Sequence, residues 1–184
     1  MNEKLIQDRI DQIKDENLKT LVTECFNRIP KYWFMKPSSS TGKYHPKEEH
    51  LPGGLSLHTA RVFDIGVKLA DARKFDCNLE IIKAGCLLHD IARFGVEEKP
   101  SEHSLKDHAN RGADWVHKIG EELNIFEDDT PLGSDTDLDR VCKAIRSHMG
   151  RWNFPEPETS DEILVHLADV VAASYVPVTG EKLV

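Results

Sequence analysis

The chain has 184 residues, of which 39% are hydrophobic and 30% are charged, a composition typical of a globular protein rather than a disordered one. Its formal net charge of −8 argues against a long nucleic-acid footprint, because duplex binding normally needs a basic face. No apolar run approaches the roughly 20 residues that cross a bilayer, and the charged N-terminus lacks the apolar core of a signal peptide. We therefore expect a single cytoplasmic domain that binds neither a membrane nor duplex nucleic acid.

The first 30 residues show helical periodicity in two pieces, separated by a break near residues 15–17. This amphipathic pair could pack on the chain's own core or on a second chain, so the sequence leaves the oligomeric state open. Pro30 then opens a long irregular segment, residues 31–54. Long segments of this kind in compact domains are usually functional or disordered, and the Trp33-Phe34-Met35 cluster favours an ordered loop.

The rest of the chain carries five further stretches of helical periodicity. The first three are expected at about residues 56–73, 79–94 and 105–123, the first of them with Ser56 as its N-cap. Asp135 or Thr136 can cap the fourth, and Thr159 with Glu162 forms a capping box before the fifth. Because no stretch alternates like a β-strand, the sequence predicts an all-α fold, a helical bundle.

Side chains that bind metals recur on the apolar faces of these expected helices, each in a stretch with helical periodicity. They are His58, His89, Asp90, His108, His148 and Asp169. His89-Asp90 follows the apolar residues Gly-Cys-Leu-Leu, where an ionisable pair is costly to bury unless it is paired or bound to metal. Imidazole and carboxylate donors suit Mn, Fe, Zn, Mg, Ni or Co rather than copper(I) or iron–sulfur centres. The four cysteines form no CxxC pair and are expected to be reduced thiols.

Five short sequence motifs, in order, carry a resemblance to a known family: GGLSLHT, LLHDIARFG, DHANRGA, IRSHMG and HLADVVAAS. With them, about residues 40–176 resemble the HD-domain superfamily of metal-dependent phosphohydrolases, an all-helical fold, and residues near His45 resemble a subset of small HD proteins that includes phage ones. The resemblance divides the chain into N-terminal helices (1–30), a substrate-side loop (31–54), a metal-binding core (55–176) and a tail (177–184).

The resemblance also implies the roles of the six residues. His58, His89, Asp90 and Asp169 would hold one divalent ion, while His108 and His148 would bind a second ion that Asp90 bridges. In this chemistry, two ions about 3.5–4 Å apart clamp the phosphoryl oxygens and activate a hydroxide. Some two-metal relatives carry a double histidine where this chain has His148-Met149, which indicates a second ion that is weaker, labile or completed by water.

Phosphate contacts need cations near the metals. Arg93 lies three residues after Asp90, so its guanidinium is expected to reach a phosphoryl oxygen, although many relatives have Lys at this position. We assign catalytic roles to Asp90, Arg93 and Lys43, and substrate contacts to Lys43, Tyr44, His45 and Arg93. The segment around Lys43 is not a P-loop, because GxxxxGK[ST] is absent.

Two further assignments stay open from the sequence alone. Arg151 and Trp152 could stack on a base or sugar of the substrate, or they could form a helix-end salt bridge and a packed aromatic. His45 or His50 could donate a proton to the leaving group.

Three functions are therefore compared. The first is hydrolysis of a phosphate monoester or diester, in a nucleotide or a small nucleic-acid-derived ester, by attack of a metal-activated hydroxide. The second is a di-iron oxygenase, since some HD proteins use the same ligands with O₂. The third is a non-catalytic ligand-binding module, which the intact ligand set disfavours. Tightly bound iron with O₂ consumption would distinguish the oxygenase.

Overall fold

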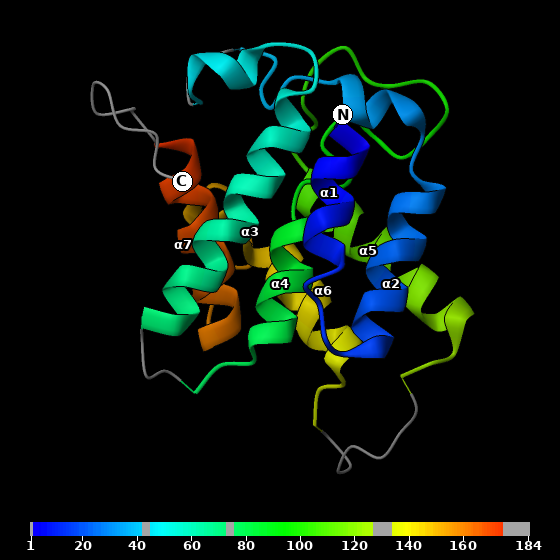
Figure 1. Ribbon diagram of the computed structural model, residues 1–184, viewed down its shortest axis with the longest axis vertical. Coiled ribbons are helices and arrows are strands. Elements are labelled where there is room, and N and C mark those ends of the chain that lie inside the picture. Colours follow the sequence, from blue (N-terminus) through cyan, green and yellow to red (C-terminus); the bar gives the residue numbers. More distant parts are fainter. Residues whose placement is uncertain (1, 42–44, 73–75, 127–133, 175–184) are drawn as a thin grey trace.

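The computed structural model describes residues 2–41, 45–72, 76–126 and 134–174, and within these ranges the regular structure is helical, with no β-strand (Figure 1). The α-helices are α1 (Asn2–Ile10), α2 (Glu16–Arg28), α3 (Gly54–Ala72), α4 (Leu79–Leu88), α5 (His108–Leu123), α6 (Asp137–Ser147) and α7 (Ser160–Ala173). Three short 3-10 helices are η1 (Lys31–Met35), η2 (Lys47–His50) and η3 (Gly150–Trp152). The all-α prediction is confirmed.

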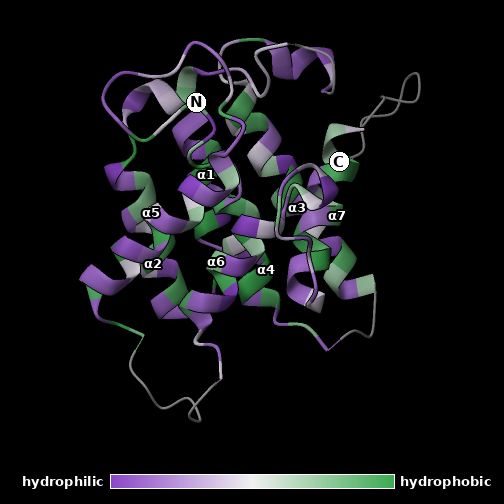
Figure 2. Ribbon diagram, turned by 180° about the vertical axis from the view of Figure 1, so that it is seen from behind, coloured by the Kyte–Doolittle hydropathy of each residue, from purple (hydrophilic) through white to green (hydrophobic). Residues whose placement is uncertain are grey.

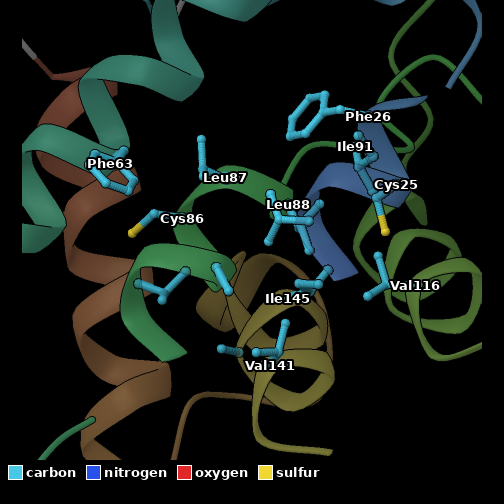
Figure 3. Packing of buried hydrophobic residues seen from close by; sticks show 14 of the residues in the cluster. Cys25, Phe26, Phe63, Cys86, Leu87, Leu88, Ile91, Val116, Val141 and Ile145 are labelled. Atoms are coloured by element: carbon cyan, nitrogen blue, oxygen red, sulfur yellow. The ribbon is translucent and has the colours of Figure 1, made fainter. Parts of the chain in front are cut away.

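Helix α4 is the central element of the bundle. It packs against α2, α3, α6 and α7, while α3 also lies along α7, and α5 lies along α6 (Figure 1). Every residue of α4 from Ile81 to Leu88 is buried. In the close-up, Leu87 and Leu88 of α4 lie among side chains of neighbouring helices, such as Val141 and Ile145 of α6 (Figure 3). A helix that is apolar all round needs this position, because it has no face to turn to water.

Hydrophilic and hydrophobic residues mix along the ribbons of the outer helices, as in helices with one face on the core (Figure 2). Helices α1 and α2, separated near Asp15 as predicted, follow this pattern, and Ile6, Ile10, Leu18 and Leu21 join the chain's own core. The N-terminal pair therefore packs on the chain's own core. None of the described helices is both long and apolar enough to span a bilayer.

The predicted caps are partly confirmed. Thr136, rather than Asp135, caps α6, in a capping box with Asp139, and Thr159 caps α7. The N-cap assigned to Ser56 is wrong. Helix α3 begins at Gly54, where the backbone passes so close to Glu49 that a Cβ atom at Gly54 would overlap it. Ser56 consequently lies buried in the first turn of the helix.

The expected helix over residues 79–94 is also wrong at its end, because α4 stops at Leu88 and His89 is its C-cap. Beyond His89 the backbone hydrogen bonds join residues three apart instead of four: Ile91 N–H donates to Leu88 O (3.1 Å), and Arg93 N–H donates to Asp90 O (3.1 Å). The carbonyl of Arg93 instead accepts from Leu105 N–H at 2.9 Å, which turns the chain away from the helix axis. His89-Asp90 therefore sits in a turn rather than within a helix.

The helix expected at about 105–123 begins at His108, and His148 is the C-cap of α6. Contrary to our expectation, helix ends and turns therefore carry several of the candidate ligands. Such positions suit ligands, since a side chain at a helix end reaches beyond the packed faces of the helix. Cys25, Cys86 and Cys142 are buried free thiols, and Cys77 is a half-buried one.

The described part of segment 31–54 is ordered by packing of Trp33 and Phe34, as expected, whereas Met35 of the same cluster is exposed. Trp33 is fully buried, with its ring edge-on to that of Phe26 at 5.2 Å between centroids. Its indole Nε1–H donates to the carbonyl of Asp90 at 3.4 Å. η1 thus supports the backbone of the turn that carries the His-Asp pair. The tail lies outside the described residues.

Candidate metal centre

The His89-Asp90 turn lies at the centre of the site, and both side chains are fully buried. His89 Nδ1–H donates to the carbonyl of Cys86 at 2.8 Å, which leaves Nε2 facing inward. This Nε2 atom is buried and makes no hydrogen bond among the described residues, and it lies 3.5 Å from Asp90 Oδ2. A buried ring nitrogen without a partner is costly in a folded protein unless it binds a ligand such as a metal ion.

His108 and His148 are held in the same way as His89. Their Nδ1 atoms donate to the carbonyls of Leu105 and Ile145, each at 2.7 Å. Their Nε2 atoms lie 3.3 Å apart, at 2.9 Å (His108) and 3.6 Å (His148) from Asp90 Oδ1. In metal-binding histidines the second ring nitrogen typically donates to a carbonyl or carboxylate in this way, which fixes the ring orientation.

The remaining two candidates come from helices that pack side by side. His58 of α3 and Asp169 of α7 meet with 3.0 Å between Nε2 and Oδ1, and the same Asp169 oxygen lies 3.9 Å from His89 Nε2. The Nδ1 atom of His58 lies 3.2 Å from Oε2 of Glu49. All six predicted residues are therefore joined in one continuous chain of contacts.

Two groups of donors within this chain of contacts fit a metal ion, with ligand atoms within 4.8 Å of one another. One group is His58, His89 and Asp90, with Asp169 beside it, and the other is Asp90, His108 and His148. Asp90 belongs to both, which is the position that a bridging carboxylate requires. The imidazole and carboxylate donors fit a divalent cation such as Mn, Fe, Co, Ni or Zn.

The electrostatics of the site favour ionised carboxylates. Burial by itself would raise the pKa of Asp90, but the charge of Arg93 and the surrounding histidines hold that pKa well below its usual range. The pKa of Asp169 is lowered in the same way, against its burial, chiefly by His58. Two ionised carboxylates, Asp90 fully buried and Asp169 partly buried, with the unpaired Nε2 of His89 between them fit a cation site.

The two histidines nearest Asp169 differ in protonation. Burial lowers the pKa of His89 to about 4, despite the nearby aspartates. Burial also acts on His58, but its contacts with Asp169 and Glu49 outweigh it and raise the pKa to about 9. Before metal binds, His89 is therefore neutral and His58 carries a proton.

Arg93 lies inside the site, although not on the helix face that we expected. Its Nη1 donates to both oxygens of Asp90, at 3.0 and 2.8 Å. Its Nε atom is buried and makes no hydrogen bond among the described residues. The guanidinium thus retains an unused donor beside the metal ligands.

Of the other predicted substrate contacts in this loop, only His45 lies within the described residues. Lys43 and Tyr44 lie outside them, while the His45 ring packs edge-on to the His58 ring at 4.6 Å between centroids. His50 Nε2–H donates to the carbonyl of His45 at 2.8 Å and His45 Nδ1 lies 3.0 Å from Glu49 Oε2, so each of the two candidate proton donors has one ring nitrogen engaged.

Arg151 and Trp152 are exposed on η3, with the Arg151 guanidinium carbon 5.0 Å from the centroid of the Trp152 ring. Among the described residues, neither makes a hydrogen bond or ion pair with the six candidate ligands. The packed-aromatic interpretation of Trp152 is wrong, because 75% of this residue is exposed.

Glu49 belongs to the site but was not predicted from the sequence. This residue is fully buried and contacts His45, His58 and Arg61. Burial by itself would raise its pKa, but these contacts lower it to about 2. The sole sequence signal was its spacing of four residues from His45, within the hydrophilic run HPKEEH that is typical of a surface turn.

Comparison with known proteins agrees with this geometry. The family model of the HD domain matches residues 55–174, so the chain belongs to the HD family of metal-dependent phosphohydrolases. Ribonuclease Y of Fusobacterium nucleatum subsp. nucleatum is 30% identical over 103 residues, which are 56% of this chain but 16% of that protein. The chain therefore spans a small part of this relative. No solved structure matches significantly.

Proposed function

We propose that this protein hydrolyses a phosphate ester of a nucleotide or of a small nucleic-acid-derived molecule, as a phosphomonoesterase or phosphodiesterase. The observation that carries the proposal is Asp90, whose two oxygens face two separate groups of histidines. One carboxylate shared by two ligand groups fits the two-ion sites of phosphoryl hydrolysis, where the ions stabilise charge on the phosphoryl oxygens and activate water.

The protein's own residues supply the remaining functions. Arg93 stabilises charge on the phosphoryl group through the guanidinium donors that Asp90 leaves free, among them the buried Nε. His45 holds a proton near the leaving group, and Lys43 and Tyr44 contact the substrate from the adjoining loop. The exposed Trp152 offers a surface on which a base can stack.

The substrate class rests on two observations. The similarity to a protein named Ribonuclease Y favours an ester of nucleic-acid origin. The net charge of −8 favours a small substrate or a strand end over a duplex, because it provides no broad basic face.

The test is elemental analysis of protein purified without chelator, followed by a panel of phosphate monoesters and diesters with Mn, Co, Ni and Mg. We expect metal-dependent release of phosphate or of a nucleoside monophosphate. If no ester is hydrolysed with any of these metals, while the iron-loaded protein consumes O₂, the di-iron oxygenase replaces this proposal. Binding of a nucleotide without turnover would instead indicate a ligand-binding module.

A further inference from the structure

His58 differs from the other candidate histidine ligands in what holds its second ring nitrogen. His89, His108 and His148 each donate Nδ1–H to a backbone carbonyl three residues earlier in the chain. His58 Nδ1 is buried, makes no such hydrogen bond among the described residues, and lies 3.2 Å from Oε2 of Glu49, nine residues earlier in η2. The orientation of this ring therefore depends on a side chain from another element.

The structure holds Glu49 firmly in this position. His45 Nδ1 lies 3.0 Å from the Oε2 atom that faces His58, and Arg61 Nη1 donates to Oε1. The carbonyl of Glu49 accepts both from the backbone N–H of Ser38 (2.9 Å) and from the Ser38 hydroxyl (3.0 Å). Both ends of the residue are thus fixed, and its side chain is excluded from solvent.

We propose that Glu49 is a positioning residue for the metal centre, which holds the His58 ring with Nδ1 protonated and Nε2 directed at the ion. A carboxylate behind a histidine ligand fixes the tautomer and makes the ligand more basic. Because His45 shares the same carboxylate, Glu49 also links the substrate-side loop to the metal site. The inference rests on the proposed role of His58 as a ligand.

Glu49, His45 and His58 also lie close enough together to hold an ion themselves. Arg61 disfavours this alternative, since its positive charge already lies on Glu49. A metal equivalent beyond two that disappears in both Glu49→Gln and His45→Ala would support the alternative and overturn the positioning role.

The first test compares Glu49→Gln with Glu48→Gln in the chelator-treated protein. Glu48 occupies the same turn and pairs with the same Arg61 (3.1 Å), but its side chain is 43% exposed, so it is a matched control. Calorimetric titration with Mn should show binding at the His58 site weakened by about 10–100-fold in Glu49→Gln. Glu48→Gln should bind as the unmodified protein does. Equal affinity in all three proteins would overturn the inference.

The second test needs no variant and decides the matter if Glu49→Gln does not fold. Nitrogen NMR of the histidines in the zinc-loaded protein should show His58 with Nδ1 protonated and Nε2 bound to zinc. Zinc on Nδ1, or an unprotonated Nδ1, would contradict the inference. If the unmodified protein binds no divalent ion, the proposed function fails as well, whereas metal binding that is insensitive to Glu49 removes this inference alone.

Discussion

The histidines of the metal centre are oriented by two different means. Three of them, His89, His108 and His148, lie at the ends of α4, α5 and α6 and are each fixed by a carbonyl of the same stretch of chain, at 2.7–2.8 Å. His58 of α3 instead lies between two carboxylates from other elements, Glu49 of η2 and Asp169 of α7. The first arrangement is local and forms with the helix ends, while the second needs the tertiary fold.

The difference extends to protonation. His89, which is oriented locally, has a pKa lowered to about 4 by burial, whereas the carboxylates around His58 outweigh its burial and raise its pKa to about 9. When a cation binds, His89 is therefore already neutral, whereas His58 must first lose a proton. Asp90 belongs to both ligand groups, the one with His58 and His89 and the one with His108 and His148, and substitutions at and around it should separate the contributions of the two groups.

The largest effect is expected for Asp90→Ala, because this carboxylate faces both ligand groups and no other described carboxylate does so. Turnover should be abolished, and the metal content should fall at both positions. The measurement is elemental analysis together with the rate on the best ester substrate. Asp64→Ala is the control, since Asp64 forms a half-exposed ion pair with Arg9. An Asp90→Ala protein that keeps two metal equivalents would show that the two ligand groups do not share this residue.

Arg93→Ala should lower turnover by about 10²–10³ while the metal content stays intact, because the expected partner of its free donors is the phosphoryl group. Steady-state kinetics with metal analysis of the same sample measures both quantities. Arg111→Ala is the control, because Arg111 is half exposed and pairs with Asp107. Full activity of Arg93→Ala would show that Arg93 only pairs with Asp90 and does not contact the phosphoryl group.

His108→Ala should weaken the ion of the His108 and His148 group by more than the roughly 10–100-fold expected for Glu49→Gln, because it removes a ligand rather than the partner of a ligand, and should leave the other ion in place. Together with Glu49→Gln, which acts on the ion of the His58 and His89 group, it tests whether the two ligand groups bind metal separately. Calorimetric titration with Mn measures both affinities. His117→Ala, a half-exposed histidine on the same helix, is the control. One bound equivalent, unchanged by His108→Ala, would remove the second position.

The smallest effect is the proton released when metal binds. With a pKa of about 9, His58 is protonated at neutral pH in the metal-free protein, and binding through Nε2 displaces that proton. Proton release should therefore be present below pH 9 and should fall by about one proton per ion as the pH rises above this value. Calorimetry in buffers of different ionisation enthalpy measures the release. The same release on both sides of this pH would contradict the protonation of His58.

The sequence predicts the locally determined features better than the distant ones. Periodicity identified the helices, and five short motifs identified the candidate ligands, because a His-Asp pair after an apolar run is costly to bury unless a cation or a charged partner binds it. The predicted end of α4 was wrong, since the bonds that turn the chain there run from Arg93 and Phe94 to residues 101 and 105. Such partners leave no trace in helical periodicity.

The place of Glu49 in the site was not predicted from the sequence for the same reason. Glu48 and Glu49 are identical in type and adjacent in a hydrophilic run, yet Glu48 is exposed and Glu49 is buried against His58. The backbone contacts of Glu49 with Ser38 and the close approach of Gly54 decide which of the two turns inward. These contacts form only when the segment packs on α3.

The most direct test of the central claim is a crystal structure of the protein loaded with Mn, with anomalous scattering used to locate the ions. We expect one ion bound by His58, His89, Asp90 and Asp169, and a second, at equal or lower occupancy, bound by Asp90, His108 and His148. An ion at another place, or a metal-loaded protein in which Asp90 turns away from either histidine group, would contradict the two-ion centre.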